Sequence, residues 1–332
     1  MSGRAGRWLG AAAAVVGAGL WIRRSVLPGR PEHARPTPHR IPDPGSRPSP
    51  DGSGVRIVVN PSSGPAWRAS PVDALRAGLP GAEVHELSPE DDLVATIDEP
   101  ADPPLVAVGA AGGDGTLGAV AVLAAERDLT FVAVPAGTLN HLARDLGLDT
   151  VDHAVEAVRA GTAVRMDLGT VGERCFVNTL TLGGYSTIVD TRERLERRLG
   201  KWPALVLALV WELPRMAPLH VEIDGQRMRL WLAWIGNCRY EPRGFGPAWR
   251  SSLDDGLLDI RFVHGGRKRS RTRFVFDVVT GRLDRCSVYE ERTATHLSIR
   301  SLDGPLRLAA GASKVSPSAA IEVAKRRRAL LV

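Results

Sequence analysis

Between Val55 and Leu146 the chain alternates short Val-rich runs with longer amphipathic stretches, and this alternation constrains the fold more than any other feature. The short runs predict strands at 55–59, 83–87, 104–108 and 130–134. The longer stretches predict helices at 67–79, 89–97, 116–126 and 138–146. Strands that alternate with helices form a parallel sheet covered on both faces, with ligands at the carboxyl ends of the strands. We therefore expect an α/β domain over residues 55–162.

The pattern changes after Gly161, where strands follow one another with few helices between them. Strands are predicted at 163–171, 175–181, 220–224, 228–235 and 257–263, with Asp224-Gly225 as a hairpin turn. One helical stretch, about 185–216, interrupts them. We expect a second, mainly β domain over residues 163–332, whose C-terminal segment 318–332 adds an element to either domain.

The first 54 residues do not have the composition of a globular domain. Trp8–Ile22 is an uncharged run of fifteen residues between arginines, so residues 1–26 predict a single hydrophobic membrane anchor, with a signal peptide or an apolar tail as alternatives. More positive charge follows this run than precedes it, which predicts a body on the cytoplasmic face of the cell membrane. Residues 27–54 contain eight prolines and predict a disordered linker.

The basic charge of the chain lies mostly in this N-terminal part. Residues 1–54 hold 8 of the 43 Lys and Arg but 3 of the 37 Asp and Glu, a net +5, which leaves +1 for the rest. Such a balanced body argues against a nucleic-acid partner. Two basic runs, at 267–273 and 325–328, predict contact with a membrane surface or are simply solvated loops.

Lysine usage limits the phosphate chemistry open to the first domain. The chain has four lysines and the first is Lys201, so a Walker A loop or a protein-kinase strand lysine is excluded before that residue. Three glycine-rich turns directly follow predicted strands instead: Asn60–Gly64, Gly112–Thr116 and Pro135–Asn140. Such turns aim backbone N–H groups and helix N-termini at one place, which predicts a polyphosphate site without a lysine.

Asp114 is unusual inside a turn that is predicted to bind an anion. A carboxylate repels phosphate unless it holds a metal ion or a proton, so Asp114 is predicted to ligate Mg²⁺ or to act as a base toward a hydroxyl group. The alternative is that Asp114 only caps the helix that follows.

Four motifs occur in a fixed order: N-P-S-S-G, G-G-D-G-T, P-A-G-T-L-N-x-x-A-R-D-L-G and, later, L-D-D-G-L-L-D at 253–259. In this order they resemble the diacylglycerol kinase catalytic domain family of lipid kinases. G-G-D-G alone is also found in NAD kinases, but the first and third motifs disfavour that alternative. The resemblance implies a nucleotide-binding α/β domain, a β-rich second domain, and transfer of the γ-phosphoryl group of ATP to a lipid hydroxyl, as in a diacylglycerol kinase.

The resemblance also assigns residues to roles. Asp114 is the implied catalytic residue, and Mg²⁺ is implied to bind Asp255 with the backbone oxygens of Ser252 and Leu257; a plain D-D-G hairpin turn is the alternative. Arg144 is implied to face phosphate, or is an exposed arginine without a role. The implied ATP-binding residues are Asn60, Pro61, Ser62, Ser63, Gly64, Gly112, Gly113, Asp114, Gly115, Thr116, Leu117, Gly118, Thr138, Asn140 and Arg144.

The chain departs from the family pattern at two places. His141 stands where the family usually has Asp, and it contacts the ligands or is an ordinary packed residue. Ala310-Gly311-Ala312 stands where the family has Asp-Gly-Glu, whose glutamate is the general base. Two hypotheses follow: a lipid kinase in which Asp114 also serves as base, and a catalytically impaired, membrane-tethered protein that binds nucleotide or lipid.

Overall fold

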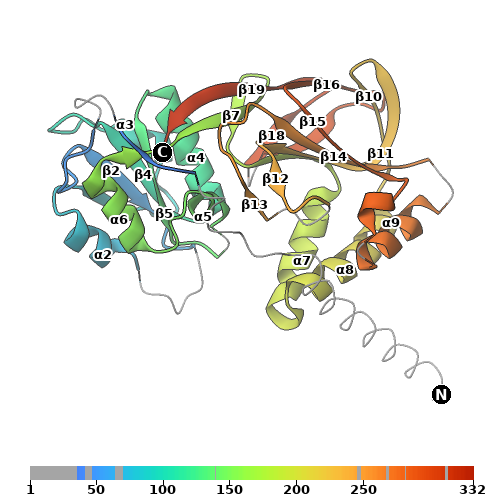
Figure 1. Ribbon diagram of the computed structural model, residues 1–332, viewed down its shortest axis with the longest axis horizontal. Coiled ribbons are helices and arrows are strands. Elements are labelled where there is room, and N and C mark those ends of the chain that lie inside the picture. The colour runs from blue at the N-terminus through green and yellow to red at the C-terminus, as the bar shows by residue number, and fades with distance from the viewer. Residues whose placement is uncertain are drawn as a thin grey trace.

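The computed structural model describes residues 36–41, 47–63, 70–138, 140–244, 248–266, 269–280, 282–310 and 313–332. Figure 1 shows two domains side by side, one built on a parallel sheet and the other on a larger antiparallel sheet. The predicted fold class, α/β with a second, mainly β domain, is confirmed.

The first domain is a four-stranded parallel sheet between two layers of helices. Its strands, in order across the sheet, are β3 (Glu83–Glu86), β2 (Val55–Val59), β4 (Ala107–Gly112) and β5 (Thr130–Pro135). Its helices are α2 (Val72–Gly78), α3 (Leu93–Asp98), α4 (Asp114–Glu126), α5 (His141–Asp145) and α6 (Val151–Ala160). Alternate strand residues face two separate cores: Val58 packs with α4, and Ile57 packs with α2 and α6. Both faces of the sheet are therefore buried, as a parallel sheet requires.

Most predicted elements of this domain have the predicted type, and the differences have local causes. Strand β4 begins at Ala107 rather than 104, because the prolines at 103 and 104 have no N–H group for the sheet. It also runs on to Gly112, the residue predicted to begin the second glycine-rich turn. Helix α6 was not predicted, although Thr150 caps it by accepting a bond from the His153 N–H group.

Part of the segment that was predicted to be a disordered linker packs on the first domain. Strand β1 (His39–Arg40) pairs antiparallel with β6 (Thr162–Ala163). Ile41 is 3% exposed, and its N–H group donates to the Gly161 carbonyl at 3.0 Å. The tether predicted from composition thus includes residues that add a short strand to the domain.

The prediction of a membrane anchor on the cytoplasmic face is corrected. In the part of the chain that the structure describes, no helix has the length and apolar character needed to cross a membrane. The apolar helix α8 (Lys201–Glu212) has 12 residues, whereas a span needs about 20. The predicted anchor itself, residues 8–22, lies outside the described residues.

The second domain is built on an eleven-stranded antiparallel sheet. Nine strands form one path: β18 (Ser313–Ser318), β17 (Leu306–Ala310), β9 (Thr179–Gly183), β11 (Gln226–Asn237), β10 (Leu219–Ile223), β16 (His296–Ser301), β19 (Ala320–Leu331), β7 (Arg165–Val171) and β8 (Arg174–Phe176). The long strand β11 also pairs with β14 (Leu258–His264), which pairs with β15 (Tyr289–Ala294). The predicted hairpin turn at Asp224-Gly225 joins β10 to β11 with positive φ at both residues, 49° and 81°.

Short elements complete this domain. A separate pair of strands, β12 (Tyr240–Glu241) and β13 (Trp249–Arg250), lies near the first domain. The helices are α7 (Tyr185–Leu199), α8, α9 (Ser270–Val279) and the short 3₁₀ turns at Leu213–Arg215 and Leu283–Arg285. Helices α7, α8 and α9 lie together below the second sheet in the view of Figure 1.

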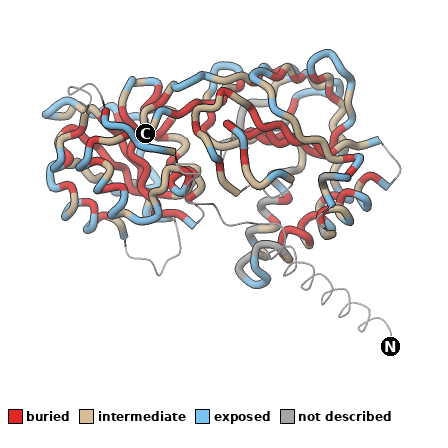
Figure 2. The backbone as a smooth tube through the Cα atoms, in the orientation of Figure 1, coloured by how far each residue is buried: buried red, intermediate tan, exposed pale blue. Residues whose placement is uncertain are grey.

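The two domains share a core and a backbone connection. Met166, Leu168 and Leu330 of the second sheet pack in the same apolar cluster as helix α4, and Figure 2 shows buried segments in both domains. The backbone groups of Val164 and Val332 pair with each other, at 2.7 and 2.9 Å, so the C-terminal strand ends beside the first domain. The relative position of the two domains is therefore fixed by packing, and not only by the connecting chain.

Candidate functional site

The first and second glycine-rich turns are joined at the carboxyl edge of the parallel sheet. The Asn60 N–H group donates to the Ala111 carbonyl at 2.9 Å, and its Nδ2 donates to Thr116 Oγ1 at 3.0 Å. Asn60 Oδ1 accepts the Ser62 N–H bond at 3.0 Å, which tightens the first turn. This asparagine therefore sets the position of one turn against the other.

The third turn packs directly on the second, and Gly137 makes this possible. A Cβ atom at Gly137 would lie 2.5 Å from the Gly113 Cα atom and 3.0 Å from the Gly112 carbonyl oxygen. Only glycine fits such an approach. Asn140, at φ 51°, closes the third turn: its Oδ1 accepts from the Gly137 N–H group at 2.8 Å and its Nδ2 donates to the Gly137 carbonyl at 2.9 Å. We call the assembly of Asn60–Ser63, Gly112–Thr116 and Gly137–Asn140 the three-turn site.

Asp114 belongs to the second turn of the three-turn site and is half-exposed, as the first residue of α4. Helix α4 has Gly113 as its N-cap residue and no side-chain capping bond, so Asp114 does not cap its own helix. Its Oδ1 instead accepts the Leu142 N–H bond of helix α5 at 3.3 Å. Among the described residues no hydrogen bond reaches Oδ2, which leaves this oxygen for a ligand or a proton.

Some of the remaining predicted ATP-binding residues lie in the three-turn site, and others do not. Pro61, Ser62, Ser63, Gly115 and Thr138 belong to the three turns, and Thr138 is exposed. Gly118 lies one turn into α4, and a Cβ atom added there would meet nothing within 4 Å. Leu117 is fully buried in the core, and its N–H group already donates to the Gly113 carbonyl at 3.0 Å, so it is a packing residue. Gly64 lies outside the described residues.

Two polar residues of α5 flank the site. His141 is half-buried as the first residue of α5, and Arg144 is exposed one turn later. The Arg144 N–H group donates to the Asn140 carbonyl at 2.9 Å, so its backbone belongs to the turn of the helix that Asn140 begins. Their side-chain roles toward phosphate stay predictions.

The residues predicted to bind Mg²⁺ lie between β13 and β14, where backbone donors already engage them. Asp255 Oδ2 accepts the Arg239 N–H bond and Oδ1 accepts the Leu257 N–H bond, both at 2.8 Å. The Leu257 carbonyl accepts the Cys238 N–H bond at 3.0 Å. The Ser252 hydroxyl donates to Asp254 Oδ1 at 3.0 Å. These contacts are those of a hydrogen-bonded D-D-G turn, which was the alternative to a Mg²⁺ site.

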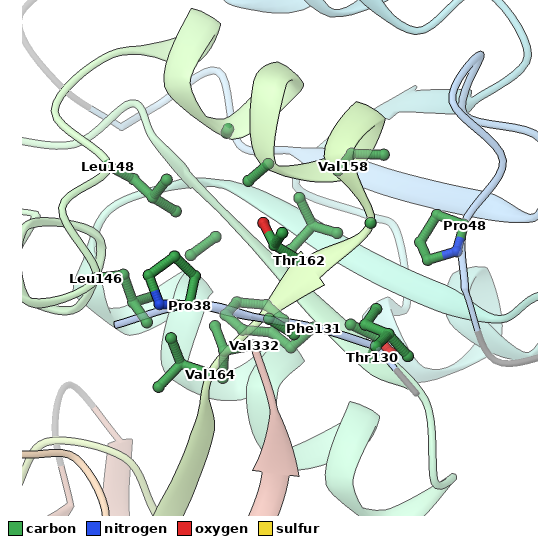
Figure 3. A pocket seen from close by; sticks show the side chains of 17 residues that line it. Pro38, Pro48, Thr130, Phe131, Leu146, Leu148, Val158, Thr162, Val164 and Val332 are labelled. Atoms are coloured by element: carbon green, nitrogen blue, oxygen red, sulfur yellow. The ribbon is translucent and has the colours of Figure 1, made fainter. Parts of the chain in front are cut away.

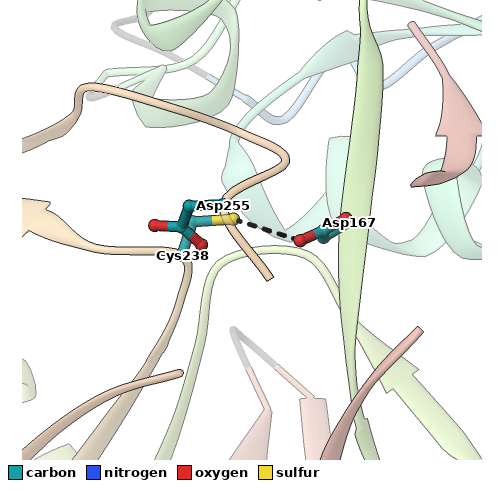
Figure 4. Close-up of side chains that lie close together, drawn as sticks. All are labelled: Asp167, Cys238 and Asp255. Atoms are coloured by element: carbon teal, nitrogen blue, oxygen red, sulfur yellow. Dashed lines mark hydrogen bonds between the residues drawn. The ribbon is translucent and has the colours of Figure 1, made fainter. Parts of the chain in front are cut away.

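A buried polar cluster next to this turn was not predicted. Ligand-type atoms of Asp167, Cys238 and Asp255 all lie within 4.8 Å of one another (Figure 4). Burial is the main reason that the pKa of Cys238 is raised, to about 12, so the thiol is protonated at neutral pH. Lys325 reaches the same cluster from β19. We call Asp167, Asn237, Cys238, Asp255 and Lys325 the Asp167 cluster.

A buried ion pair that joins the domains was also missed. Arg250 Nε donates to Asp145 Oδ2 at 2.6 Å, and the two side chains are 0% and 2% exposed. The same guanidinium donates to the Val177 carbonyl at 2.9 Å and to Asn178 Oδ1 at 3.1 Å. Burial alone lowers the pKa of Arg250, but its neighbours Tyr240 and Asp145 outweigh this and raise it. The one sequence feature that pointed to this pair is Asp145, the aspartate of A-R-D in the third motif and the last residue of helix α5.

The stretch that corresponds to the family's Asp-Gly-Glu forms the hairpin of β17 and β18. Ala310 ends β17 and pairs with Leu180 of β9, while residues 311–312 lie outside the described residues. Strand β9 follows Asn178, which contacts Arg250 at the domain interface. The hairpin thus approaches the interface, but residues 305–321 contain no Asp or Glu. It supplies no carboxylate to the site.

A cavity of about 100 Å³ lies elsewhere in the first domain (Figure 3). Its walls are apolar and include the first residues of β5, Thr130–Ala133, together with helix α6 and the prolines Pro38 and Pro48. The third turn follows the opposite, carboxyl end of β5. This cavity is therefore separate from the three-turn site, and its lining offers no charged group to a phosphate.

Fold and site together define an α/β protein with a glycine-rich site beside a β domain. Residues 54–171 match the family described as the diacylglycerol kinase catalytic domain.

Curated relatives resemble the chain in sequence, and a solved structure resembles it in fold. The chain is 29% identical over 187 residues to the probable lipid kinase YegS of Escherichia fergusonii, covering 52% of this chain and 62% of that protein. It is 31% identical over 169 residues to the lipid kinase YegS of Escherichia coli K12, covering 47% and 56%. The matches thus span about three fifths of these relatives' length. A putative diacylglycerol kinase of Bacillus anthracis has the same fold, with TM-score 0.64, 20% identity, and coverage of 83% of this chain and 95% of that one.

Proposed function

We propose that this chain is an ATP-dependent lipid kinase that transfers the γ-phosphoryl group of ATP to the hydroxyl group of a diacylglycerol-like lipid. One observation carries the proposal: three glycine-rich turns contact one another, and the second of them carries the carboxylate of Asp114, in a domain without lysine. The relatives named as lipid kinases support the choice of a lipid acceptor. The match of residues 54–171 to the diacylglycerol kinase catalytic domain supports the same choice.

The backbone of the three-turn site is suited to hold the phosphates of a nucleotide. Successive N–H groups at glycine-rich turns form concave anion sites, and the N-terminus of the 13-residue helix α4 adds its dipole at the same place. Phosphoryl transfer depends mostly on positioning and electrostatic stabilisation. Mg²⁺ that arrives with the nucleotide supplies neutralisation of the phosphate charge.

Asp114 is the residue we assign to the lipid hydroxyl. The Leu142 N–H group holds Oδ1, so Oδ2 accepts the hydroxyl proton. The lipid oxygen then bonds to the γ-phosphorus, the bond from that phosphorus to the bridging oxygen breaks, and ADP leaves. Asp114 takes the place of the family's glutamate, because residues 305–321 supply no carboxylate.

The helical end of the second domain supports an apolar substrate and a membrane surface as partner. Val210 and Trp211 on α8 and Phe276 on α9 are 50%, 58% and 57% exposed. Arg215 lies over the Trp211 ring at 5.5 Å, so a cation accompanies the aromatic side chain. Aromatic side chains flanked by arginines are suited to the boundary between lipid and water.

The decisive experiment follows radiolabel from [γ-³²P]ATP into vesicles that contain diacylglycerol, for the wild type and Asp114→Asn. Asparagine keeps an oxygen for the Leu142 N–H bond but loses the charge and the capacity to act as base. We expect labelled lipid with the wild type and a rate lower by about 10²–10⁴ with the variant.

Two other outcomes contradict the proposal. Binding of Mg·ATP without transfer to any lipid of a total extract supports the catalytically impaired binding protein instead. Label in NAD rather than lipid supports an NAD kinase. Circular dichroism of both proteins, with urea unfolding, is the control that Asp114→Asn is folded.

A further inference from the structure

The Asp167 cluster contains a cation that belongs to the chain itself. Lys325 Nζ lies 3.4 Å from Asp167 Oδ2 and 3.2 Å from Cys238 Sγ, and it also donates to Asn237 Oδ1. An ammonium group has three hydrogen-bond donors and no acceptor. Two of these donors form the hydrogen bonds to Asn237 at the end of β11 and to Cys238 directly after it, and the charge pairs with Asp167 of β7.

Burial makes this cation necessary. The side chains of Asp167 and Lys325 are 0% and 2% exposed. A buried carboxylate needs a compensating charge and hydrogen bonds. The Arg328 and Gly256 N–H groups also donate to Asp167, at 2.7 and 2.8 Å, so both carboxylate oxygens have partners. Charge and hydrogen-bonding demands of Asp167 are met within the chain.

The same contacts are unsuitable for Mg²⁺, which the family resemblance implied at Asp255. Mg²⁺ requires near-octahedral oxygen ligands at 2.0–2.1 Å, generally with several waters. The oxygens of Asp255 and the Leu257 carbonyl accept backbone N–H bonds, and an ammonium group occupies the space between Asp167 and Cys238. A divalent ion would lie against that positive charge. The residues therefore do not fit the metal.

We propose that Lys325 is the resident cation of the Asp167 cluster, and that its ammonium group takes the position of a divalent ion in the second domain. Folding of this domain then needs no divalent metal, and Mg²⁺ enters only with a nucleotide. The role of Lys325 and the folding of the domain without a metal do not rest on the proposed kinase activity, whereas the entry of Mg²⁺ with a nucleotide does.

The first test uses the nucleotide-free, full-length wild type and measures the midpoint of thermal unfolding. We expect Mg²⁺ at millimolar concentration to change the midpoint no more than KCl of the same ionic strength. A stabilisation by Mg²⁺ that Asp255→Ala abolishes would overturn the proposal. Because no nucleotide is present, this result is independent of whether the chain is a kinase.

The second test removes the ammonium group. In Lys325→Ala the carboxylates, the thiol and the amide oxygen lose their cation and gain space, so we expect Mn²⁺ and Cd²⁺ to raise the unfolding midpoint by about 2 °C or more. Cd²⁺ should also give the ultraviolet charge-transfer band of a thiolate ligand, which reports Cys238. Lys325→Met keeps the space filled, and we expect it to be destabilised without any response to either ion.

Arg326→Ala is the matched control, because it removes an exposed positive charge from the next residue of the same strand. We expect it to behave like the wild type toward all three ions. If Lys325→Ala is unfolded without metal, recovery of the folded circular dichroism spectrum in Mn²⁺ supports the proposal. A Lys325→Ala protein that responds to neither Mn²⁺ nor Cd²⁺ contradicts it.

Discussion

The three-turn site and the Asp167 cluster are both polar and both lie near the domain interface, but they are built in opposite ways. The three-turn site consists mostly of backbone groups from short contiguous motifs, held by Asn60, Asn140 and the contact of Gly137 with Gly113. The Asp167 cluster consists mostly of buried side chains from segments far apart in the chain, such as Asp167 and Lys325. The comparison suggests that the first site serves ligand binding, and that the second, with the Arg250–Asp145 pair, serves the stability of the molecule.

The largest effect that we predict tests whether the buried Arg250–Asp145 pair stabilises the molecule. Arg250→Met removes the fully buried guanidinium that pairs with the buried carboxylate of Asp145, and breaking a buried ion pair in this way costs about 3–5 kcal/mol of unfolding free energy. Urea unfolding at neutral pH measures this loss. The double variant Arg250→Met/Asp145→Leu should recover a large part of it, since the buried carboxylate is removed as well.

The exposed pair of Arg127 and Asp98 supplies the control. Arg127→Met removes a pair whose side chains are 24% and 48% exposed, and we expect a loss of about 0–1 kcal/mol. If Arg250→Met costs no more than Arg127→Met, the buried pair does not stabilise the interface as argued.

This contrast also explains how much of the molecule could be predicted from the sequence. Strand β2, strand β5 and the three turns follow from short runs of adjacent residues: valines for the strands, then glycine, asparagine and proline for the turns. The hairpin at Asp224-Gly225 has the same local origin. For Asp114, the sequence left open two roles, a cap of helix α4 and a ligand. The structure contradicts the cap, because the Asp114 carboxylate accepts a hydrogen bond from helix α5 instead.

The rest depends on pairing between distant segments. Lys325 was predicted as part of a basic surface run, yet its side chain is buried, because the register of β19 against β7 turns it toward the Asp167 cluster. Nothing local distinguishes Lys325 from the exposed Arg326 beside it. The same holds for Lys325 as the cation that we propose in place of Mg²⁺, because it lies seventy positions beyond Asp255 in the chain.

A second prediction tests whether the close contact between the turns of the three-turn site is needed for ligand binding. Gly137→Ala places a Cβ atom 2.5 Å from the Gly113 Cα atom, so the third turn must move away from the second. A displacement of about 1 Å at a positioned site costs about 10² in activity, and we expect a loss of that size in kcat/KM for ATP. The unfolding free energy should fall by about 1–3 kcal/mol, less than for Arg250→Met.

Gly118→Ala tests whether the Gly137 effect comes from contact or merely from losing a glycine. Nothing lies within 4 Å of a Cβ atom at Gly118, and alanine favours the helix by about 0.5–1 kcal/mol, so this variant should be slightly more stable than the wild type. Equal destabilisation by the two substitutions would contradict the packing described for the turns.

The smallest effect that we predict concerns alkaline pH and the Asp167 cluster. Burial raises the pKa of Cys238 from 9.0 to about 12, so above pH 9 the unfolded chain releases a thiol proton that the folded chain retains. Unfolding free energy from this thiol is fully present below about pH 9 and is lost as pH rises toward 12. Between pH 9 and pH 10 the wild type should lose about 1 kcal/mol more unfolding free energy than Cys238→Ala in urea unfolding.

Cys175→Ala, which removes a half-buried thiol, should change the slope of unfolding free energy against pH less. Parallel pH profiles for the wild type and Cys238→Ala would show that the Asp167 cluster is more open to water than its contacts indicate.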